Sequence, residues 1–236
     1  FTSAATPTFI WLKERAKPSA VKNKLSEIAS GAFKQVFEII ADAKKHRDLF
    51  TFLLSLLCYS CGSTTVVALA AVYAEQVMGF KTNESIFLIM VVNVTAAVGA
   101  FVFGFIQDKV GSVRTIAVTL VLWSLAIFIA FATTNKEGFW LAANIMGIAM
   151  GASASAGRAL VGRLSPVGRS AEFFGLWGLS VKLSAIIGPM TYGLVTYLSG
   201  SNYRLALLST LMFFILGLII VFFVDEKRGR QQALLG

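Results

Sequence analysis

Six long apolar segments constrain this chain more than any other feature of its sequence. Each reaches the roughly 20 residues that an α-helix needs to cross about 30 Å of hydrocarbon. A helix pairs its own backbone groups, as lipid requires, and the alternating pattern of a transmembrane barrel is absent. The sequence therefore predicts an all-α membrane protein with six transmembrane helices, at approximately Phe50–Val77, Ser85–Ile106, Val113–Thr133, Phe139–Leu160, Phe173–Leu198 and Leu205–Val224.

The composition supports a membrane protein and argues against a soluble one. The 236 residues are 56% hydrophobic and 14% charged, against about 45–50% and about 25% in an average soluble domain. The formal net charge is +9, but so apolar a chain has too little polar surface for a nucleic-acid interface. We therefore expect the lipid bilayer, and no nucleic acid, as a partner.

The positive charges gather on one side of the predicted membrane. Seventeen of the 21 Lys and Arg lie in or near the two chain ends and the connections at 108–111 and 165–169. Only Lys81, Lys136 and Arg204 lie on the other side, and Lys182 lies inside a span. By the positive-inside rule, both termini are predicted to be cytoplasmic.

The chain divides into four predicted parts. Residues 1–12 resemble the end of a preceding transmembrane helix, and residues 13–48 form a basic amphipathic linker in the cytoplasm. The linker either lies on anionic lipid at the membrane surface or packs on the cytoplasmic face of the protein, and the sequence leaves both open. Residues 49–225 form the six-helix bundle, and residues 226–236 form a cytoplasmic tail.

The residue sets that enzymes use are missing from the sequence. His46 is the one histidine, and Cys58 and Cys61 form a C-x-x-C inside a span with no second pair of ligands. We expect no enzyme activity, no metal and no cofactor.

Polar residues at membrane depth are the best candidates for function, because ionisable groups there are costly and usually serve a pathway. Lys182 lies near the middle of its span on a face of small residues, at a 3–4–3–4 spacing with Gly175, Gly178, Ala185 and Pro189. Such a face either packs against another helix or borders a cavity. A structural ion pair for Lys182 remains an alternative.

Other spans repeat this arrangement of small and polar residues. Gly147 and Gly151 form a GxxxG on one face with Asn144, Ala154 and Arg158. Several such faces indicate a central cavity open to water. With Lys182, the candidates for binding solute or ion are Asn93, Asn144, Tyr59, Ser63, Thr64 and Glu75.

Residues Gly104 to Arg114 (GFIQDKVGSVR) resemble the loop between the second and third helices of each half of the major facilitator superfamily. In that loop Gly104 permits close helix approach, and Asp108 either caps a neighbouring helix or pairs with a base. A second stretch, Arg163 to Ser180 with Lys182, is similar to the vacuole-effluxer-like branch of that superfamily, whose fungal members are associated with amino-acid efflux from the vacuole. The resemblance implies a cytoplasmic gate and loop motif made of Gly104, Asp108, Lys109, Gly111, Arg114, Arg158, Arg163, Arg169 and Glu172.

The resemblance covers nearly the whole chain as helices 7–12, that is, the C-terminal six-helix half of a major facilitator fold. It implies a secondary transporter that moves a small solute, such as an amino acid or another small organic metabolite, by alternating access. It also implies a multi-pass protein of a bacterial inner (plasma) membrane. The cavity would be completed by the missing N-terminal half or by a second copy in a homodimer. The alternative is a non-transporting six-span scaffold or regulatory module that acts as a dimer.

Overall fold

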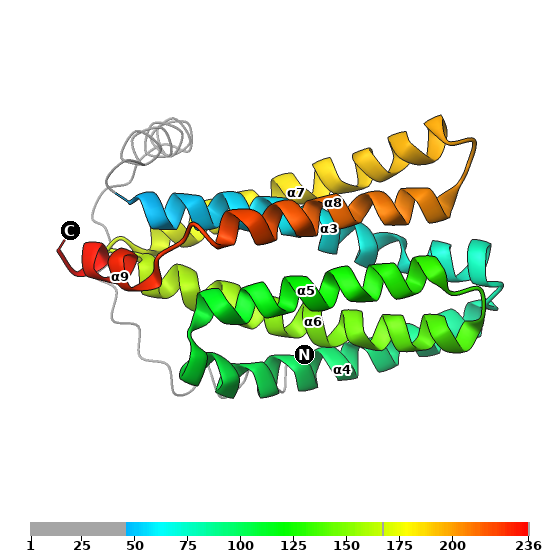
Figure 1. Ribbon diagram of the computed structural model, residues 1–236, viewed down its shortest axis with the longest axis horizontal. Helices are drawn as coiled ribbons and strands as arrows, with labels where there is room; N and C mark the ends of the chain where they lie inside the picture. The colour runs from blue at the N-terminus through cyan, green and yellow to red at the C-terminus, as the bar shows by residue number, and fades with distance from the viewer. Residues whose placement is uncertain (1–45, 167, 236) are drawn as a thin grey trace, which may run out of the picture. The chain divides into compact units, whose positions relative to one another are not determined.

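The fold is described from a computed structural model, which places residues 46–166 and 168–235. The described part of the chain is entirely helical and contains no strand (Figure 1). Its helices are α3 (Arg47–Met78), α4 (Thr82–Val110), α5 (Ser112–Ala132), α6 (Lys136–Leu164), α7 (Ser170–Leu198), α8 (Tyr203–Val221) and α9 (Glu226–Leu235).

The six predicted spans are confirmed. Helices α3 to α8 are each long and apolar enough to cross a membrane, and most extend past the predicted ends. The last is shorter than predicted: α8 ends at Val221 rather than Val224, because the chain turns at Phe222 and Phe223 before α9 begins. The predictions for residues 1–12 and 13–45 lie outside the described residues.

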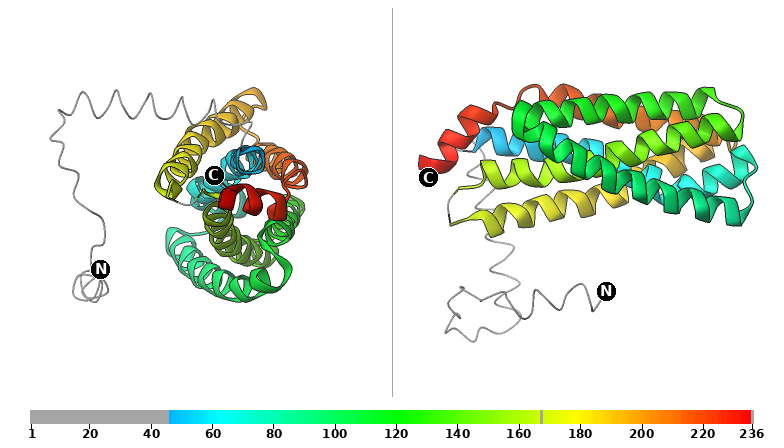
Figure 2. Two further views of the ribbon diagram at one scale, coloured as in Figure 1. Left: turned by 90° about the vertical axis from the view of Figure 1, so that its left-hand side faces the viewer. Right: turned by 90° about the horizontal axis from the view of Figure 1, so that it is seen from below.

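The helices form two groups of three. α3 packs against α7 and α8, whereas α6 packs against α4 and α5, and the contact between α5 and α8 joins the groups (Figures 1 and 2). If α3, α4 and α5 are exchanged with α6, α7 and α8 in order, each of these contacts becomes a contact of the same set. Two inverted three-helix repeats, each with an odd number of spans, give this pattern of contacts.

Small residues set the closest helix contacts, as expected where backbones must approach. A Cβ added at Gly151 would overlap the Ala96 carbonyl oxygen, and one at Gly147 would overlap the Thr95 hydroxyl. The predicted GxxxG therefore packs directly on α4. Between α3 and α8 the Ser55 hydroxyl donates a 2.7 Å hydrogen bond to the carbonyl oxygen of Gly217.

The core lies between the two groups of helices, and the outer surface is apolar. The rings of Trp123 and Phe214 stack at a centroid distance of 5.0 Å, and both side chains are fully buried. Phe101, Phe128 and Met190 are more than half exposed. A surface with so many large exposed apolar side chains matches lipid, and the protein is a multi-pass membrane protein.

The two ends of the bundle differ in charge. We call the end where α4 meets α5 and α6 meets α7 the basic end, because it carries Lys109, Arg114, Arg163 and Arg169. Helix α9 lies across this end (Figure 2). The sequence predicted a tail for residues 226–236 without a helix there.

Candidate functional site

Lys182 lies where no other described helix covers it. It is the thirteenth residue of α7, about 18 Å from the start of that helix, and its side chain is exposed. On the same face, a Cβ at Gly175 or Gly178 would meet nothing within 4 Å. The small-residue face predicted for this helix is therefore open in the described bundle, and no ion pair of Lys182 with another described residue occurs.

The rest of the exposed surface of α7 has a different character. Leu179, Leu183 and Met190 are 44%, 42% and 68% exposed and lie roughly 60–100° around the helix axis from Lys182. Large apolar side chains suit lipid, whereas a charge at the bilayer centre costs about 2.5–3.5 kcal/mol on insertion scales. Helix α7 therefore separates an apolar face that suits lipid from a face that suits water or another part of the protein.

Arg158 brings a second charge to the neighbouring part of α6. It is exposed, as is Ala154 one turn earlier. The guanidinium carbon of Arg158 lies 5.9 Å from the ring centroid of Trp177 on α7, a cation–π distance. This contact bridges α6 and α7 between the basic end and the level of Lys182.

Three of the four polar candidates on α3 are less accessible than Lys182. Tyr59 is 4% exposed, and a Cβ at Gly157 of α6 would lie 2.9 Å from its hydroxyl oxygen. The hydroxyls of Ser63 and Thr64 donate to carbonyl oxygens of the preceding turn, and that of Thr64 also lies 3.3 Å from the Ser184 carbonyl oxygen of α7. Ser63 and Thr64 are half-buried at the α3–α7 contact, while Tyr59 is a core residue.

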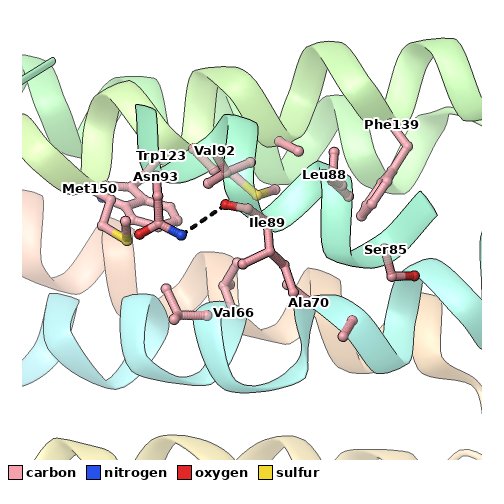
Figure 3. Close-up of a pocket in the computed structure, with 14 residues that line it drawn as sticks. Val66, Ala70, Ser85, Leu88, Ile89, Val92, Asn93, Trp123, Phe139 and Met150 are labelled. Atoms are coloured by element: carbon pink, nitrogen blue, oxygen red, sulfur yellow. Dashed lines mark hydrogen bonds between the residues drawn. The ribbon is translucent and has the colours of Figure 1, made fainter. Parts of the chain in front are cut away.

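A cavity of about 130 Å³ lies between α3, α4 and α6 and has Asn93 in its wall (Figure 3). The remaining wall is mainly apolar, with Phe139 and Met146 among its residues. Two buried polar atoms in the wall, Ser85 Oγ and Trp123 Nε1, have no hydrogen-bond partner within residues 46–166 and 168–235. Both atoms are covered by the protein itself, so the surface that the cavity presents is almost wholly apolar and suits an apolar group.

The other polar candidates lie apart from this cavity or at its edge. Asn144 is half-buried, and its amide donates to the Trp140 carbonyl oxygen at 2.8 Å. Glu75 is half-exposed in the last turn of α3, at the end of the bundle away from the basic end. The structure thus brings Asn93 to a cavity and Lys182 to an open face, but it does not gather all the candidates at one point.

The face of α4 that packs is not the one that the motif predicts. Gly104 makes no close helix approach, because a Cβ there would meet nothing within 4 Å. The close approach is made by Gly99, where a Cβ would overlap the Ile148 carbonyl oxygen. Towards the basic end a groove separates α4 from α6, and Gly104 and Arg163 line it.

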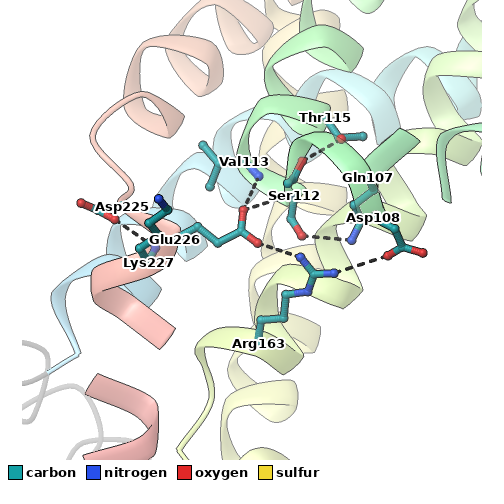
Figure 4. A network of polar contacts seen from close by, with 10 residues as sticks. Gln107, Asp108, Ser112, Val113, Thr115, Arg163, Asp225, Glu226 and Lys227 are labelled. Atoms are coloured by element: carbon teal, nitrogen blue, oxygen red, sulfur yellow. Dashed lines mark hydrogen bonds and ion pairs between the residues drawn. The ribbon is translucent and has the colours of Figure 1, made fainter. Parts of the chain in front are cut away.

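Glu226 is the centre of a polar network at the basic end (Figure 4). Its carboxylate accepts hydrogen bonds from the backbone N–H groups of Ser112 and Val113 at 2.8 and 3.2 Å, which caps the first turn of α5. Its other oxygen lies 2.8 Å from Arg163 Nη1 on α6. Gly111 precedes this turn with φ of 92°, where a side chain would be strained and would approach the same carboxylate.

The remaining residues of the loop motif have varied contacts. Asp108 lies 3.5 Å from Arg163 and does not cap α5, which Glu226 does instead. Arg169 and Glu172 form an ion pair at 2.8 Å at the start of α7. Lys109 and Arg114 are exposed.

A second clip holds α9 to the start of α3. The Asp48 side chain is 1% exposed and accepts two hydrogen bonds from Arg228, at 2.8 and 2.7 Å, and one from the Asp225 backbone N–H. The Asp48 carboxylate raises the pKa of the Arg228 guanidinium. A Cβ at Gly229 would approach Leu164 and Asp48 closely, so α9 packs tightly here.

Glu226, Asp48 and Arg228 were missed by the sequence analysis. Their partners lie 63 to 180 residues away in the sequence, so no local spacing predicts the pairs. One signal was available: Asp225 follows an apolar run and precedes a polar stretch, which is typical of a helix N-cap. Its carboxylate accepts the N–H groups of Lys227 and Arg228.

Comparison with known families and proteins gives consistent results. The family model described as "Vacuole effluxer Atg22 like" matches residues 2–234. The chain is 24% identical over 204 residues to the uncharacterized MFS-type transporter YxiO of Bacillus subtilis, covering 86% of this chain and 47% of that protein. It is 27% identical over 229 residues to autophagy-related protein 22 of Vanderwaltozyma polyspora, covering 92% and 44%. The chain spans about half the length of the curated relatives it matches.

Two solved transporter structures share the fold. A bacterial homolog of the human lysosomal transporter Spinster, in an inward-facing and unoccupied conformation, aligns with a TM-score of 0.67 at 16% identity, over 98% of this chain and 57% of that one. The Escherichia coli fucose:proton symporter FucP aligns with a TM-score of 0.70 at 14% identity, over 94% and 52%. At these identities the likeness shows the fold: one six-helix half of a major facilitator transporter.

Proposed function

The chain belongs to the vacuole effluxer Atg22-like family of major facilitator transporters, and from this premise we propose that it is the C-terminal half of a secondary active transporter. The full protein would move a small solute by alternating access. In such proteins the solute lies near the midplane of the membrane, between two halves that rock around it.

The main observation that supports this proposal is the position of Lys182. A lysine near the middle of α7, exposed beside Gly175 and Gly178, requires water or a partner surface next to it. The apolar face of α7 that includes Leu183 and Met190 provides the lipid contact instead. A second half, supplied by an N-terminal segment or by another copy of this chain, would enclose the lysine in a central cavity.

The chemistry of the site favours a small organic solute with an anionic group. Lys182 would attract a carboxylate or take part in proton coupling. Asn93, Asn144, Ser63 and Thr64 would supply neutral polar contacts. An amino acid or another small organic metabolite fits this set, and the family description, vacuole effluxer, supports transport without naming a solute.

The charge distribution supports an orientation for the bundle. The basic end, with Lys109, Arg114, Arg163 and Arg169, would face the cytoplasm by the positive-inside rule. Both termini would then be cytoplasmic, in a bacterial inner membrane. In this orientation the network of Glu226 and Arg163 lies on the cytoplasmic side, where it would hold the helix ends as the gate opens and closes.

Transport by the full-length protein in proteoliposomes tests the proposal. A panel of radiolabelled amino acids and carboxylates identifies a solute, and the Lys182→Ala, Lys182→Arg and Lys81→Ala variants are then compared. Lys182→Ala should abolish coupled transport, Lys182→Arg should retain part of it, and Lys81→Ala should resemble the wild type. Unchanged transport by Lys182→Ala would remove the lysine from the mechanism. A stable dimer with no transport of any solute would favour the scaffold alternative.

A further inference from the structure

An apolar groove runs along the outer surface of the bundle between α5 and α8. Its volume is about 590 Å³, and its walls include Val118 and Val121 of α5 and Leu218 and Phe222 of α8. The two helices pack side by side (Figure 1). Val118, Val121 and Phe222 are 50%, 52% and 70% exposed. The walls of this groove are mainly apolar, which suits a lipid acyl chain.

A second hollow, of about 710 Å³, continues from the groove at the basic end. Val113, Arg114 and Phe222 line both spaces, so the apolar groove leads directly into the hollow. The hollow is formed by the α4–α5 connection and by the start of α9. Arg114 is the third residue of α5, and Phe222 directly follows α8. The junction therefore lies at the ends of two spans, at the level where headgroups meet hydrocarbon.

Four exposed cations surround the hollow: Lys109, Arg114, Lys227 and Arg230. None of the four forms an ion pair with another residue in the described part of the chain. Arg228, the fifth cation there, is bound to Asp48. The hollow therefore presents several positive charges that the protein itself does not neutralise.

The acidic side chains around the hollow are engaged elsewhere. Glu226 caps α5 and pairs with Arg163. Asp108 is directed to the same arginine, and Asp225 accepts the N–H groups of the first turn of α9. Five cations against three carboxylates leave the lining of the hollow with a net charge of +2, which suits an anion better than the cationic amine of a zwitterionic lipid.

We propose that the α5–α8 groove and the adjoining basic hollow form a binding site for an anionic glycerophospholipid. One acyl chain lies in the groove beside Val121 and Leu218. The phosphate lies near Arg114 and receives hydrogen bonds and charge from Arg230 and its neighbours. Because the groove continues into the hollow, the site recognises chain and phosphate together, which distinguishes a lipid from a free anion. The bound lipid connects the α4–α5 connection to α9.

Native mass spectrometry of the full-length protein in an uncharged maltoside detergent tests this site. Dioctanoylphosphatidylglycerol is titrated into the wild type, Arg230→Gln, Arg114→Gln/Arg230→Gln and Val121→Trp. Lys81→Gln, which removes a cation at the opposite end, is the matched control. Dioctanoylphosphatidylcholine and inorganic phosphate are the comparison ligands.

The proposal predicts that phosphatidylglycerol binds more tightly than phosphatidylcholine. Since each interfacial cation is worth roughly 1 kcal/mol, Arg230→Gln should weaken the affinity about fivefold and the double variant about 25-fold. Val121→Trp should weaken lipid binding by filling the groove, and Lys81→Gln should change nothing. Size-exclusion profiles identify any variant that fails to fold, and the single variants then carry the comparison.

Three outcomes would overturn the proposal. The first is equal affinity for phosphatidylglycerol and phosphatidylcholine in the wild type. The second is equal loss of affinity in Arg230→Gln and Lys81→Gln. The third is displacement of the lipid by an equal concentration of inorganic phosphate, together with normal binding by Val121→Trp, which would indicate a plain anion site.

Discussion

Two glycines five residues apart on α4 should respond oppositely to the same substitution. A Cβ at Gly99 would overlap the Ile148 carbonyl oxygen and lie 2.7 Å from the Ile148 Cα, whereas at Gly104 it would meet nothing within 4 Å. Ordinary contact begins at 3.4 Å and the nearest atom, the Ile148 carbonyl oxygen, would lie about 1.0 Å inside that limit, so Gly99→Ala must separate α4 from α6 locally by about 1.0 Å. Backbone lines this contact, so no side chain can move away to make room.

The magnitude follows from the cost of overpacking. Such changes destabilise a protein by about 1–3 kcal/mol, and at about 2–4 °C per kcal/mol for a chain of this size Tm should fall by about 2–12 °C. Gly104→Ala gains up to about 1 kcal/mol of helix propensity with no clash, so Tm should stay constant or rise.

Thermal unfolding of the detergent-solubilised 236-residue chain, followed by intrinsic tryptophan fluorescence, measures both variants. The wild type and both alanine variants are compared at one detergent concentration, because detergent itself shifts Tm. If Gly104→Ala lowers Tm as much as Gly99→Ala, the α4–α6 contact is not where the structure puts it, and the reasoning fails.

Two further predictions concern the basic end and the cavity. Glu226→Gln keeps an acceptor for the α5 N–H groups but loses the charge opposite Arg163, whereas Glu226→Ala also loses the cap, at a cost of about 1 kcal/mol. The Tm of Glu226→Gln should therefore lie between those of the wild type and Glu226→Ala. Equal Tm values for the two variants would contradict the capping role. Ala143→Leu fills part of the cavity beside Asn93 and should therefore reduce transport by the full-length protein. Its Tm should stay within about 2 °C of the wild type, because the added methyl groups occupy empty space. Normal transport by this variant would show that the cavity is not on the solute path.

The sequence was sufficient to predict the number and the type of the membrane-spanning helices. Hydropathy and turn residues defined the six spans to within a few residues, because the bilayer fixes the length and polarity of every crossing. The resemblance carried by Gly104 to Arg114 also indicated the superfamily, and that carried by Arg163 to Ser180 with Lys182 indicated the vacuole-effluxer-like branch. These features are local, so a single sequence contains them.

The long-range pairings could not be read from the sequence. Nothing in the periodicity of α4 distinguishes the face of Gly99, which packs, from the face of Gly104, which does not. Asp48 and Arg228 are 180 residues apart, and only the packing of α9 across the basic end brings them together. Helix α9 itself is short and polar, so its stability depends on these contacts rather than on its own pattern.

The candidate site was predicted in part for the same reason. Lys182 was apparent because a charge in an apolar span is unusual, and the structure adds that its face is open. The wall of the cavity beside Asn93 includes Ser85 and Trp123, whose unpaired polar atoms have no signature in sequence. Burial decides their importance, and burial depends on how α3, α4 and α6 meet.

The central claim is that Lys182 faces an aqueous pathway while the residue beside it faces lipid. Single cysteines at Lys182→Cys and Leu183→Cys in a cysteine-free background of the full-length protein, in native membranes, test this at one depth in the bilayer. A charged, membrane-impermeant thiol reagent should label Lys182→Cys at least tenfold faster than Leu183→Cys, and transported solute should slow that labelling. Equal labelling rates at the two positions, with no effect of solute, would contradict the account.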